Sequence, residues 1–345
     1  MKGVRITMRK YLRRLSLVVL VLFGCIAIIA SGEEDTKPVP EKRETGVYNY
    51  IITDYTDGEG RITRTWSRKY DEAEVLQMEK SEYYNTDENL VKEEGDDDGD
   101  GTLDWVYTYT YEGLNLTFAV YEDIADASTN AARYFYDDHG NITERQADLS
   151  YDGAEFSADQ VYAYTYEDID GEWEMVLERL DEDDDGDWDY TNIFSYDENG
   201  NLEKVEYYFG DEAEAYTTSS YTYVLIADEW YMEVTLTDLD NNGETDFSYG
   251  YDYDDDGNMT SMESFLGEPE DGTLVTGNYY SYDDEDLLIK EEIDDSGNGK
   301  IDNAIYYEYY ADGNLWKKKY DYDNNDPEEC DLIYIWTYET IVEGE

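Results

Sequence analysis

A nine-residue acidic motif recurs at regular spacing along this 345-residue chain. Its four complete copies begin at residues 96, 181, 238 and 294. Each copy carries an oxygen-bearing side chain at positions 1, 3 and 5, glycine at position 6 and aspartate at position 9. Successive copies start 85, 57 and 56 residues apart, which are close to multiples of 28. A fixed period of this size indicates a repeat architecture, in which each unit is stable only when it packs on its neighbours.

A second motif alternates with the first and consists of an aromatic residue, a polar turn, Gly-Asn and an apolar residue. Its copies begin at Tyr136, Tyr196, Tyr253 and Tyr310. Between the motifs, tyrosine alternates with small or β-branched residues, as in residues 107–111, and this period of two is typical of a strand. Asp, Gly and Asn tolerate the backbone of a tight turn, so each next strand should return antiparallel. The sequence therefore predicts an all-β chain of tandem antiparallel hairpins, each of about 28 residues, over residues 46–345.

Two architectures fit such hairpins. In the first, they form an elongated or spiralling sheet with two open ends, and the terminal units are atypical. In the second, they form a β-propeller-like fold, in which each double unit of about 57 residues supplies one four-stranded blade. The repeat region would then hold about five and a half blades, a number that closes poorly. We expect the spiralling sheet and keep the propeller as the alternative.

The unit resembles the YD repeat of the RHS family of bacterial exported proteins. The resemblance depends on the Tyr-Asp-x-x-Gly-Asn-Leu turns and covers residues 46–345. It implies tandem hairpins that coil into a long sheet, which in that family can close into a shell. Family members usually carry Arg after the turn glycine, whereas here only Arg61 does so. Large members also end in a conserved core and a toxic payload, whereas the repeats here continue to the end of the sequence, so the resemblance does not imply toxin delivery.

The charge of the chain excludes several functions. It contains 88 Asp and Glu against 24 Lys and Arg, for a net charge of −64. Such a surface repels phosphate, so we expect no nucleic-acid partner. A single histidine leaves little room for histidine-based catalysis or a zinc site. Although highly acidic chains are often disordered, 16% aromatic residues and only 4 prolines predict a folded chain. A halophilic source would also explain the acidic composition.

The first 32 residues have the order of an export signal. A basic segment, residues 1–14, precedes the apolar residues 15–30 and then Ser31 and Gly32. Residues 22–25 resemble a bacterial lipobox, which would make Cys25 the lipidated residue; the alternatives are cleavage after Ala30 or Gly32, or an uncleaved anchor. Residues 33–45 read as a polar tether. The sequence predicts an exported protein, held at the cell envelope as a lipoprotein or secreted, that contacts a membrane only through this N-terminal segment.

The acidic motifs predict calcium sites. Oxygen ligands at positions 1, 3 and 5 can wrap a hard cation, the glycine permits the turn, and position 9 adds a carboxylate. A fifth copy begins at Asp321 and ends at Glu329, and a partial sixth copy begins at Asp148. The expected ligands are Asp96, Asp98, Asp100, Asp104, Asp181, Asp183, Asp185, Asp189, Asp238, Asp240, Asn242, Asp246, Asp294, Ser296, Asn298, Asp302, Asp321, Asp323, Asn325 and Glu329. The alternative is that these residues only favour turns.

We expect no enzyme, because carboxylate pairs occur throughout and no pair is distinguished as a general acid and base. His139 occupies a variable turn position, and Cys330 has no partner for a disulfide once the signal is removed. The sequence favours a calcium-binding structural or adhesive scaffold, with cell-surface glycans or proteins as partners. The alternative is a carbohydrate- or peptide-binding array that uses exposed tyrosines and tryptophans, of which the candidates are Trp105, Trp173, Trp188, Trp230, Trp316 and Trp336. A glycan-active enzyme is the remaining possibility.

Overall fold

The computed structural model describes residues 46–57, 59–311, 313–322 and 330–342. Backbone contacts divide the chain into residues 1–44 and 45–345, and all described residues belong to the second unit. The signal, the tether and Cys25 therefore lie outside the described residues. No helix in the described ranges has the length and apolar character needed to cross a bilayer.

The described residues form 21 strands of one sheet. The strands are β1 (Gly46–Thr56), β2 (Ile62–Tyr70), β3 (Leu76–Tyr84), β4 (Leu90–Asp96), β5 (Trp105–Glu112), β6 (Asn115–Asp123), β7 (Ser128–Tyr136), β8 (Ile142–Asp148), β9 (Gln160–Ile169), β10 (Glu172–Asp181), β11 (Tyr190–Tyr196), β12 (Leu202–Phe209), β13 (Thr217–Ile226), β14 (Glu229–Asp238), β15 (Phe247–Tyr253), β16 (Met259–Leu266), β17 (Thr273–Tyr282), β18 (Leu288–Asp294), β19 (Asn303–Tyr309), β20 (Leu315–Asp321) and β21 (Leu332–Val342). Every strand pairs antiparallel with the next one along the chain. The prediction of an all-β chain is confirmed.

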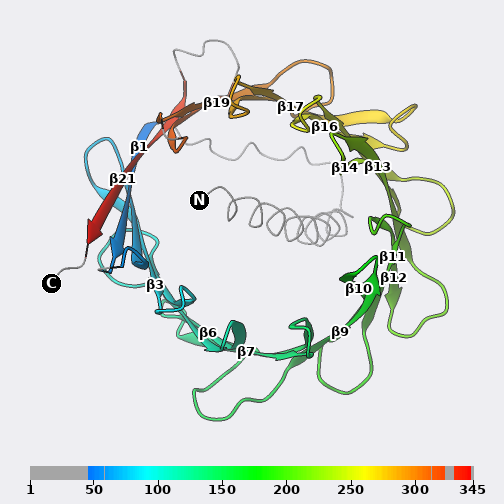
Figure 1. Ribbon diagram of the computed structural model, residues 1–345, viewed down its shortest axis with the longest axis horizontal. Helices are drawn as coiled ribbons and strands as arrows, with labels where there is room; N and C mark the ends of the chain where they lie inside the picture. The colour runs from blue at the N-terminus through cyan, green and yellow to red at the C-terminus, as the bar shows by residue number, and fades with distance from the viewer. Residues whose placement is uncertain (1–45, 58, 312, 323–329, 343–345) are drawn as a thin grey trace. The chain divides into compact units, whose positions relative to one another are not determined.

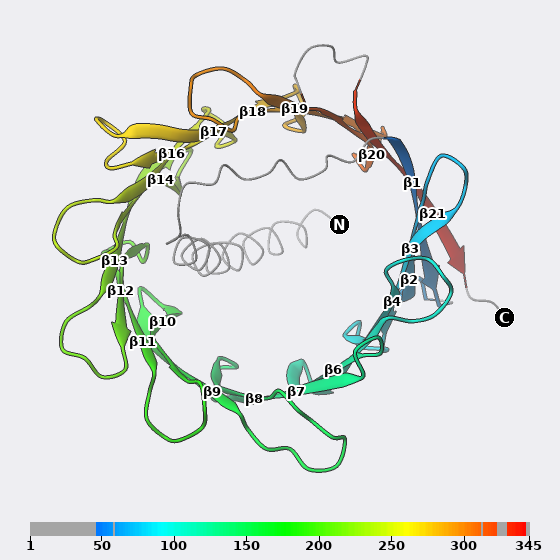
Figure 2. The same cartoon turned by 180° about the vertical axis from the view of Figure 1, so that it is seen from behind.

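The sheet closes on itself through its first and last strands. β1 pairs parallel with β21 over eleven residues, from Gly46 opposite Leu332 to Thr56 opposite Val342. Figures 1 and 2 show the strands following one another around the ring, with β21 returning beside β1. Because successive strands reverse direction, an odd number of strands makes the closing pair parallel. Stacked rings support this seam, with 5.4 Å between the ring centroids of Tyr50 and Trp336.

This closure corrects the expected architecture. Both the open, elongated or spiralling sheet and the β-propeller are wrong, because the chain forms a closed 21-stranded barrel. The physical reason is that an open array exposes unpaired backbone groups along each terminal strand, and pairing the two terminal strands removes both edges. β21, which has no partner turn in the sequence, is the strand that completes the ring.

The tyrosine of the turn motif braces neighbouring hairpins. Tyr136 Oη donates a hydrogen bond to the carbonyl oxygen of Leu116 over 2.7 Å, and Leu116 is the residue at which the β5–β6 register shifts. A bulge of this kind interrupts the ladder of strand hydrogen bonds. Equivalent bonds join Tyr196 to Met175 and Tyr253 to Met232, and two further tyrosines that end a strand before a turn, Tyr282 and Tyr309, bond to Met259 and Leu288 in the same way, over 2.7 to 2.8 Å. The repeated tyrosine thus donates a hydrogen bond to the carbonyl oxygen at the bulge of the preceding hairpin.

Burial occurs within the wall of the barrel. A closed sheet of this many strands is too wide for side chains to fill its interior. Accordingly, the most buried apolar side chains are mostly small, and Ala147, Val205 and Ala304 are only 3%, 0% and 1% exposed. Tyrosine rings also stack along individual strands, as in the pair of Tyr107 and Tyr109 on β5, with centroids 6.1 Å apart.

In such a meander, successive connections lie at opposite ends of the barrel. The connection after β1 and every second one after it are short turns, such as residues 137–141 and residues 227–228. The other end carries the connections after β4, β8, β10, β14, β18 and β20, which begin at the acidic motifs. All six acidic loops therefore share one rim, which we call the acidic rim.

Candidate metal-binding loops

The first aspartate of each acidic loop is the last residue of a strand. These residues are Asp96, Asp148, Asp181, Asp238, Asp294 and Asp321, and all except Asp238 are at most 4% exposed. The carboxylates of Asp96, Asp148, Asp181, Asp238 and Asp294 accept backbone hydrogen bonds from the loop that follows. Asp96, for example, accepts from the N–H groups of Gly99 and Gly101 over 2.6 and 2.7 Å. The buried carboxylate therefore organises the loop around itself.

The ninth-position aspartate fixes the other end of the loop. Asp104 donates its N–H to the carbonyl oxygen of Gly95, and its carboxylate accepts from the N–H of Asp97 over 2.6 Å. Asp189 and Asp246 repeat both contacts in their own loops. Each carboxylate is thereby held beside the first aspartate, where the next strand begins.

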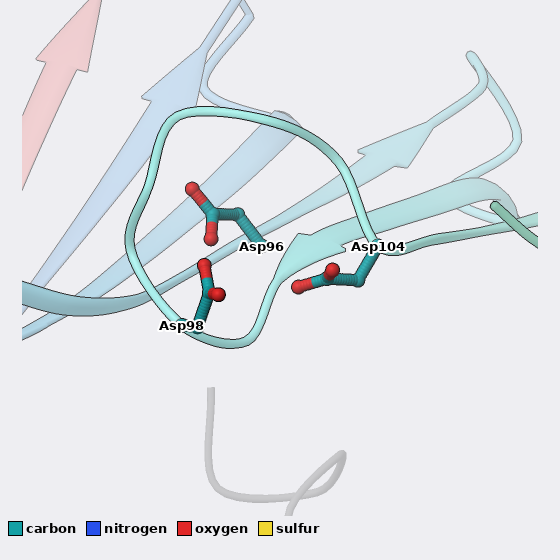
Figure 3. A group of neighbouring side chains, drawn as sticks. All are labelled: Asp96, Asp98 and Asp104. Atoms are coloured by element: carbon teal, nitrogen blue, oxygen red, sulfur yellow. The ribbon is translucent and has the colours of Figure 1, made fainter. Parts of the chain in front are cut away.

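Three loops bring three carboxylates together. The groups are Asp96, Asp98 and Asp104; Asp181, Asp183 and Asp189; and Asp238, Asp240 and Asp246, and within each group one oxygen per residue lies within 4.8 Å of the others. Figure 3 shows the three side chains of the first group directed toward one another inside the loop. The structure thus gathers positions 1, 3 and 9, and three hard oxygen ligands at this spacing suit a divalent cation such as calcium.

The side chain at position 5 makes a hydrogen bond within the loop. Asp100, Asp185, Asn242 and Asn298 each accept, through a side-chain oxygen, a hydrogen bond from the backbone N–H two residues along, over 2.7 to 2.9 Å. They shape the turn around the glycine at position 6.

The fourth complete loop has a hydroxyl in place of a carboxylate. Ser296 Oγ donates to Asp294 Oδ1 over 3.2 Å and lies 3.1 Å from Asp302 Oδ2, so it bridges the two acids. Desolvation raises the pKa of Asp294, but backbone hydrogen bonds from Gly299, Asn298 and Ser296 outweigh it and leave the pKa below its ordinary value. This loop gathers the same three positions with one charge fewer.

Like charges crowd the second loop. The carboxylate of Asp185, followed by desolvation and the carboxylate of Asp189, raises the pKa of Asp183 above its ordinary value. A bound dication would reverse this repulsion, because the same oxygens would then face a positive charge.

Two aspartates with the ninth-position role were missed in the sequence. Asp159 donates its N–H to the carbonyl oxygen of Ala147 and accepts from the N–H of Leu149 over 2.7 Å. Asp331 donates to Tyr320 and accepts from the N–H of Tyr322 over 2.9 Å. Each directly precedes a strand, as Asp104 does, and that position was the available signal. Asp323, Asn325 and Glu329, the other expected ligands of the last loop, lie outside the described residues.

The remaining candidate residues lie elsewhere. The ring of His139 stacks on Trp173, with 4.2 Å between centroids, beside a short turn at the end opposite the acidic rim. Burial raises the pKa of the half-buried Cys330 thiol. Among the expected tryptophans, Trp173, Trp230 and Trp316 are 42%, 43% and 39% exposed, whereas Trp105, Trp188 and Trp336 are half-buried.

Comparison with known proteins gives only distant matches. No protein-family model matches the chain, and no curated protein matches it significantly. Among solved structures, it is similar to a TcdB2–TccC3 chain, with a TM-score of 0.38 and 13% identity over 79% of this chain and 16% of that chain. It is also similar to a chain of the Photorhabdus luminescens Tc holotoxin pore, with a TM-score of 0.37 and 14% identity over 80% and 15% of the two chains.

A third similar structure is a porin-like protein from Bacteroides uniformis, with a TM-score of 0.31 and 12% identity over 67% of this chain and 88% of that chain. This chain thus spans less than one fifth of the length of the two toxin chains. Likeness at this level identifies neither a family nor an activity.

Proposed function

We propose that this chain is an exported, calcium-binding, RHS-like repeat protein that acts as a structural or adhesive scaffold at the cell surface. The observation that carries the proposal is the set of three equivalent loops, each with three carboxylates that approach within 4.8 Å on one rim of a closed barrel. The basic and apolar N-terminal sequence supports export, either as a lipoprotein attached through Cys25 or as a secreted protein. Calcium is abundant outside cells, where weak sites of this kind can be filled.

Calcium would act on stability through the loops. An ion that binds the folded loops and not the unfolded chain stabilises the fold by about 2.7 kcal/mol per site when it is present at about 100 times its Kd. The rim is where this contribution is needed, because each carboxylate group concentrates three negative charges in one short loop. The folded scaffold would therefore be more stable to unfolding in calcium than without it.

The test is thermal unfolding of the full chain, followed by circular dichroism in EGTA, in calcium and in magnesium at one ionic strength. We expect a rise in Tm that is specific to calcium. An unchanged Tm would overturn the calcium proposal, and equal stabilisation by any salt would favour the halophilic explanation of the acidic composition.

A charge-matched pair of variants tests the site itself. Asp183→Asn removes one carboxylate of the second group, and the control Asp255→Asn removes an exposed acid from a turn at the opposite end. In EGTA, Asp183→Asn should not lower Tm, because it relieves the repulsion from Asp185 and Asp189. In calcium it should reduce the rise in Tm, whereas Asp255→Asn should leave that rise unchanged.

A second candidate function is a carbohydrate- or peptide-binding array. It is favoured by the exposure of Trp173, Trp230 and Trp316, each of which leaves about two fifths of its side chain in solvent. Trp173→Ala and Trp230→Ala, assayed for loss of binding to glycans or peptides, would test this candidate. A scaffold whose only ligand is calcium would lose no binding partner in these variants.

A further inference from the structure

The structure contains a groove beside the loop of the partial sixth acidic motif, away from the three carboxylate groups. It has a volume of about 690 Å³ and lies between the β6–β7 hairpin and the connection of residues 149–159. This volume falls within the range of small-molecule sites in proteins, about 300–1,000 Å³. The connection is the longest between two strands of the described chain. Its residues form one wall of the groove, and the hairpin forms the other.

Both ends of the connection are anchored. The carboxylate of Asp159 accepts the N–H of Leu149 over 2.7 Å, and the carboxylate of Asp148 accepts the N–H of Ser157 over 2.9 Å. These two bonds close the base of the loop. The wall that the loop forms is therefore fixed where it leaves and rejoins the barrel.

The middle of the connection packs on the sheet through aromatic rings. The ring of Phe118, on β6, lies 5.9 Å from that of Tyr151 and 6.2 Å from that of Phe156. The guanidinium of Arg133, on β7, lies 4.0 Å from the centre of the Phe156 ring, a cation–π contact. The loop is thus packed against the strands, and Tyr151 is held at the edge of the groove.

Hydroxyl groups with unused hydrogen-bonding capacity line the groove. Thr129, Ser150 and Tyr151 are among its lining residues, and none of their three hydroxyls has a hydrogen-bond partner among the described residues. Each hydroxyl can both donate and accept. A ligand that offers several donors and acceptors close together would satisfy them.

Carboxylates and apolar groups complete the lining. Glu122 and Asp152 line the groove, and no lysine, arginine or histidine does so. The Asp152 carboxylate already accepts the N–H of Ala154 through Oδ1, which leaves Oδ2 open to a ligand. Anionic ligands are excluded by these charges and by the net charge of −64. Val120 and Leu149 supply apolar surface between the polar groups.

We propose that this groove binds a neutral carbohydrate, a short oligosaccharide segment. Sugar hydroxyls donate to the two carboxylates and exchange hydrogen bonds with the hydroxyls of Thr129, Ser150 and Tyr151. The apolar C–H face of a sugar ring packs against Val120, Leu149 and the Tyr151 ring. The site is separate from the calcium groups and from the exposed tryptophans, so it does not depend on the scaffold function proposed above.

The test uses the full chain in calcium, so that the proposed calcium sites are filled and the barrel is stabilised against unfolding. Maltotriose, cellotriose, chitotriose and xylotriose are offered singly at about 10 mM, a concentration that reveals millimolar affinity. Binding is followed by saturation-transfer NMR and by calorimetry. We expect saturable binding of at least one of the four sugars.

Variants locate the site. Thr129→Val and Tyr151→Phe remove one hydroxyl each and keep the shape of the groove, so each should weaken binding up to about tenfold, the effect of one lost hydrogen bond. Thr222→Val, on β13, is the matched control, because that side chain does not line the groove. Phe156→Leu alters the packing of the loop without removing a lining group and reports on any general effect of loop packing.

Three results would overturn the proposal. The first is that none of the four sugars binds while the protein remains folded by circular dichroism. The second is that a sugar binds with equal affinity to Thr129→Val, Tyr151→Phe and the parent, or loses binding only in Trp173→Ala, which would place the site elsewhere. The third is that an alkylammonium ion binds in the groove at a concentration at which none of the four sugars does.

Discussion

The Asp331 carboxylate accepts a hydrogen bond from the backbone N–H of Tyr322 over 2.9 Å and so closes the loop that leads into β21. Asp104, Asp159, Asp189 and Asp246 make the same contact in their own loops. The contact is common to loops of different length, and each of these five aspartates lies directly before the next strand. It therefore defines the base of these acidic loops better than the spacing of their ligands does.

The first prediction concerns this contact. Asp331→Ala removes the acceptor of the Tyr322 N–H, and losing the partner of a hydrogen bond to a charged group costs about 1–3 kcal/mol. We expect a lower free energy of unfolding in urea and faster hydrogen exchange at the Tyr322 amide. Glu214→Ala, an exposed acid in the β12–β13 connection, is the control and should change neither. Unchanged exchange in Asp331→Ala would show that the loop does not need this carboxylate.

The second prediction concerns the tyrosine brace. Tyr136→Phe keeps the ring and removes the hydroxyl that donates to the Leu116 carbonyl, so the variant should lose about 1 kcal/mol of stability. Tyr134→Phe, on the same strand, is the matched control, because no hydrogen bond of the Tyr134 hydroxyl occurs among the described residues. Chemical denaturation of both variants measures the difference. Equal losses would mean that the ring, and not the hydroxyl, accounts for the effect.

The third prediction concerns ring closure. Asn49 and Ile335 face each other across the parallel β1–β21 seam. In a chain whose Cys330 is replaced by serine, Asn49→Cys with Ile335→Cys should form an intramolecular disulfide on mild oxidation, because paired strands lie about 4.8 Å apart. Migration on a non-reducing gel reports the bond. An open array would leave these cysteines unlinked, as should the control pair Asn49→Cys with Ile193→Cys, since Ile193 lies on β11.

The fourth prediction concerns pH. Burial raises the pKa of Glu178 above its ordinary value, and the hydrogen bond from Asn192 offsets this only in part. The folded chain therefore holds a proton that the unfolded chain has lost, and its stability falls as pH rises above about 4.5, the ordinary pKa.

The Glu178→Gln side chain cannot ionise, so it removes the fall in stability with rising pH, and its amide oxygen can still accept the Asn192 hydrogen bond. The variant should have a higher Tm than the parent near pH 7 and the same Tm near pH 3, where both side chains are neutral. Glu167→Gln, an exposed acid on the neighbouring strand, should behave like the parent at both values. A Glu178→Gln variant less stable than the parent near pH 7 would contradict the burial argument.

Local features of the fold were predictable from the sequence. The tyrosine alternation of residues 107–111 and the turn that follows Tyr196 are local signals, and the structure has β5 and the β11–β12 hairpin at these places. Closure was not predictable in the same way. β1 and β21 lie at opposite ends of the repeat region, and no local sequence pattern in either strand predicts that the two pair.

The candidate site was also predictable in part. Positions 1, 3 and 9 of three loops come together as expected, because their spacing is fixed within one short segment. Position 5 stays a predicted ligand, and the structure adds that its side chain accepts a backbone hydrogen bond within the loop, as Asp100 does from the N–H of Thr102. The groove beside residues 149–159 depends on packing between Tyr151 and Phe118, which the sequence separates by about 30 residues and no motif connects.

The parity of the strand count has an evolutionary consequence. A repeat unit of about 28 residues contributes two strands, so gaining or losing whole units changes the circumference of the barrel and leaves the number of strands odd. The last strand would then always meet the first in the same parallel orientation. A lineage could therefore widen or narrow the ring by duplicating or deleting units and conserve one unchanged junction, the one between β1 and β21.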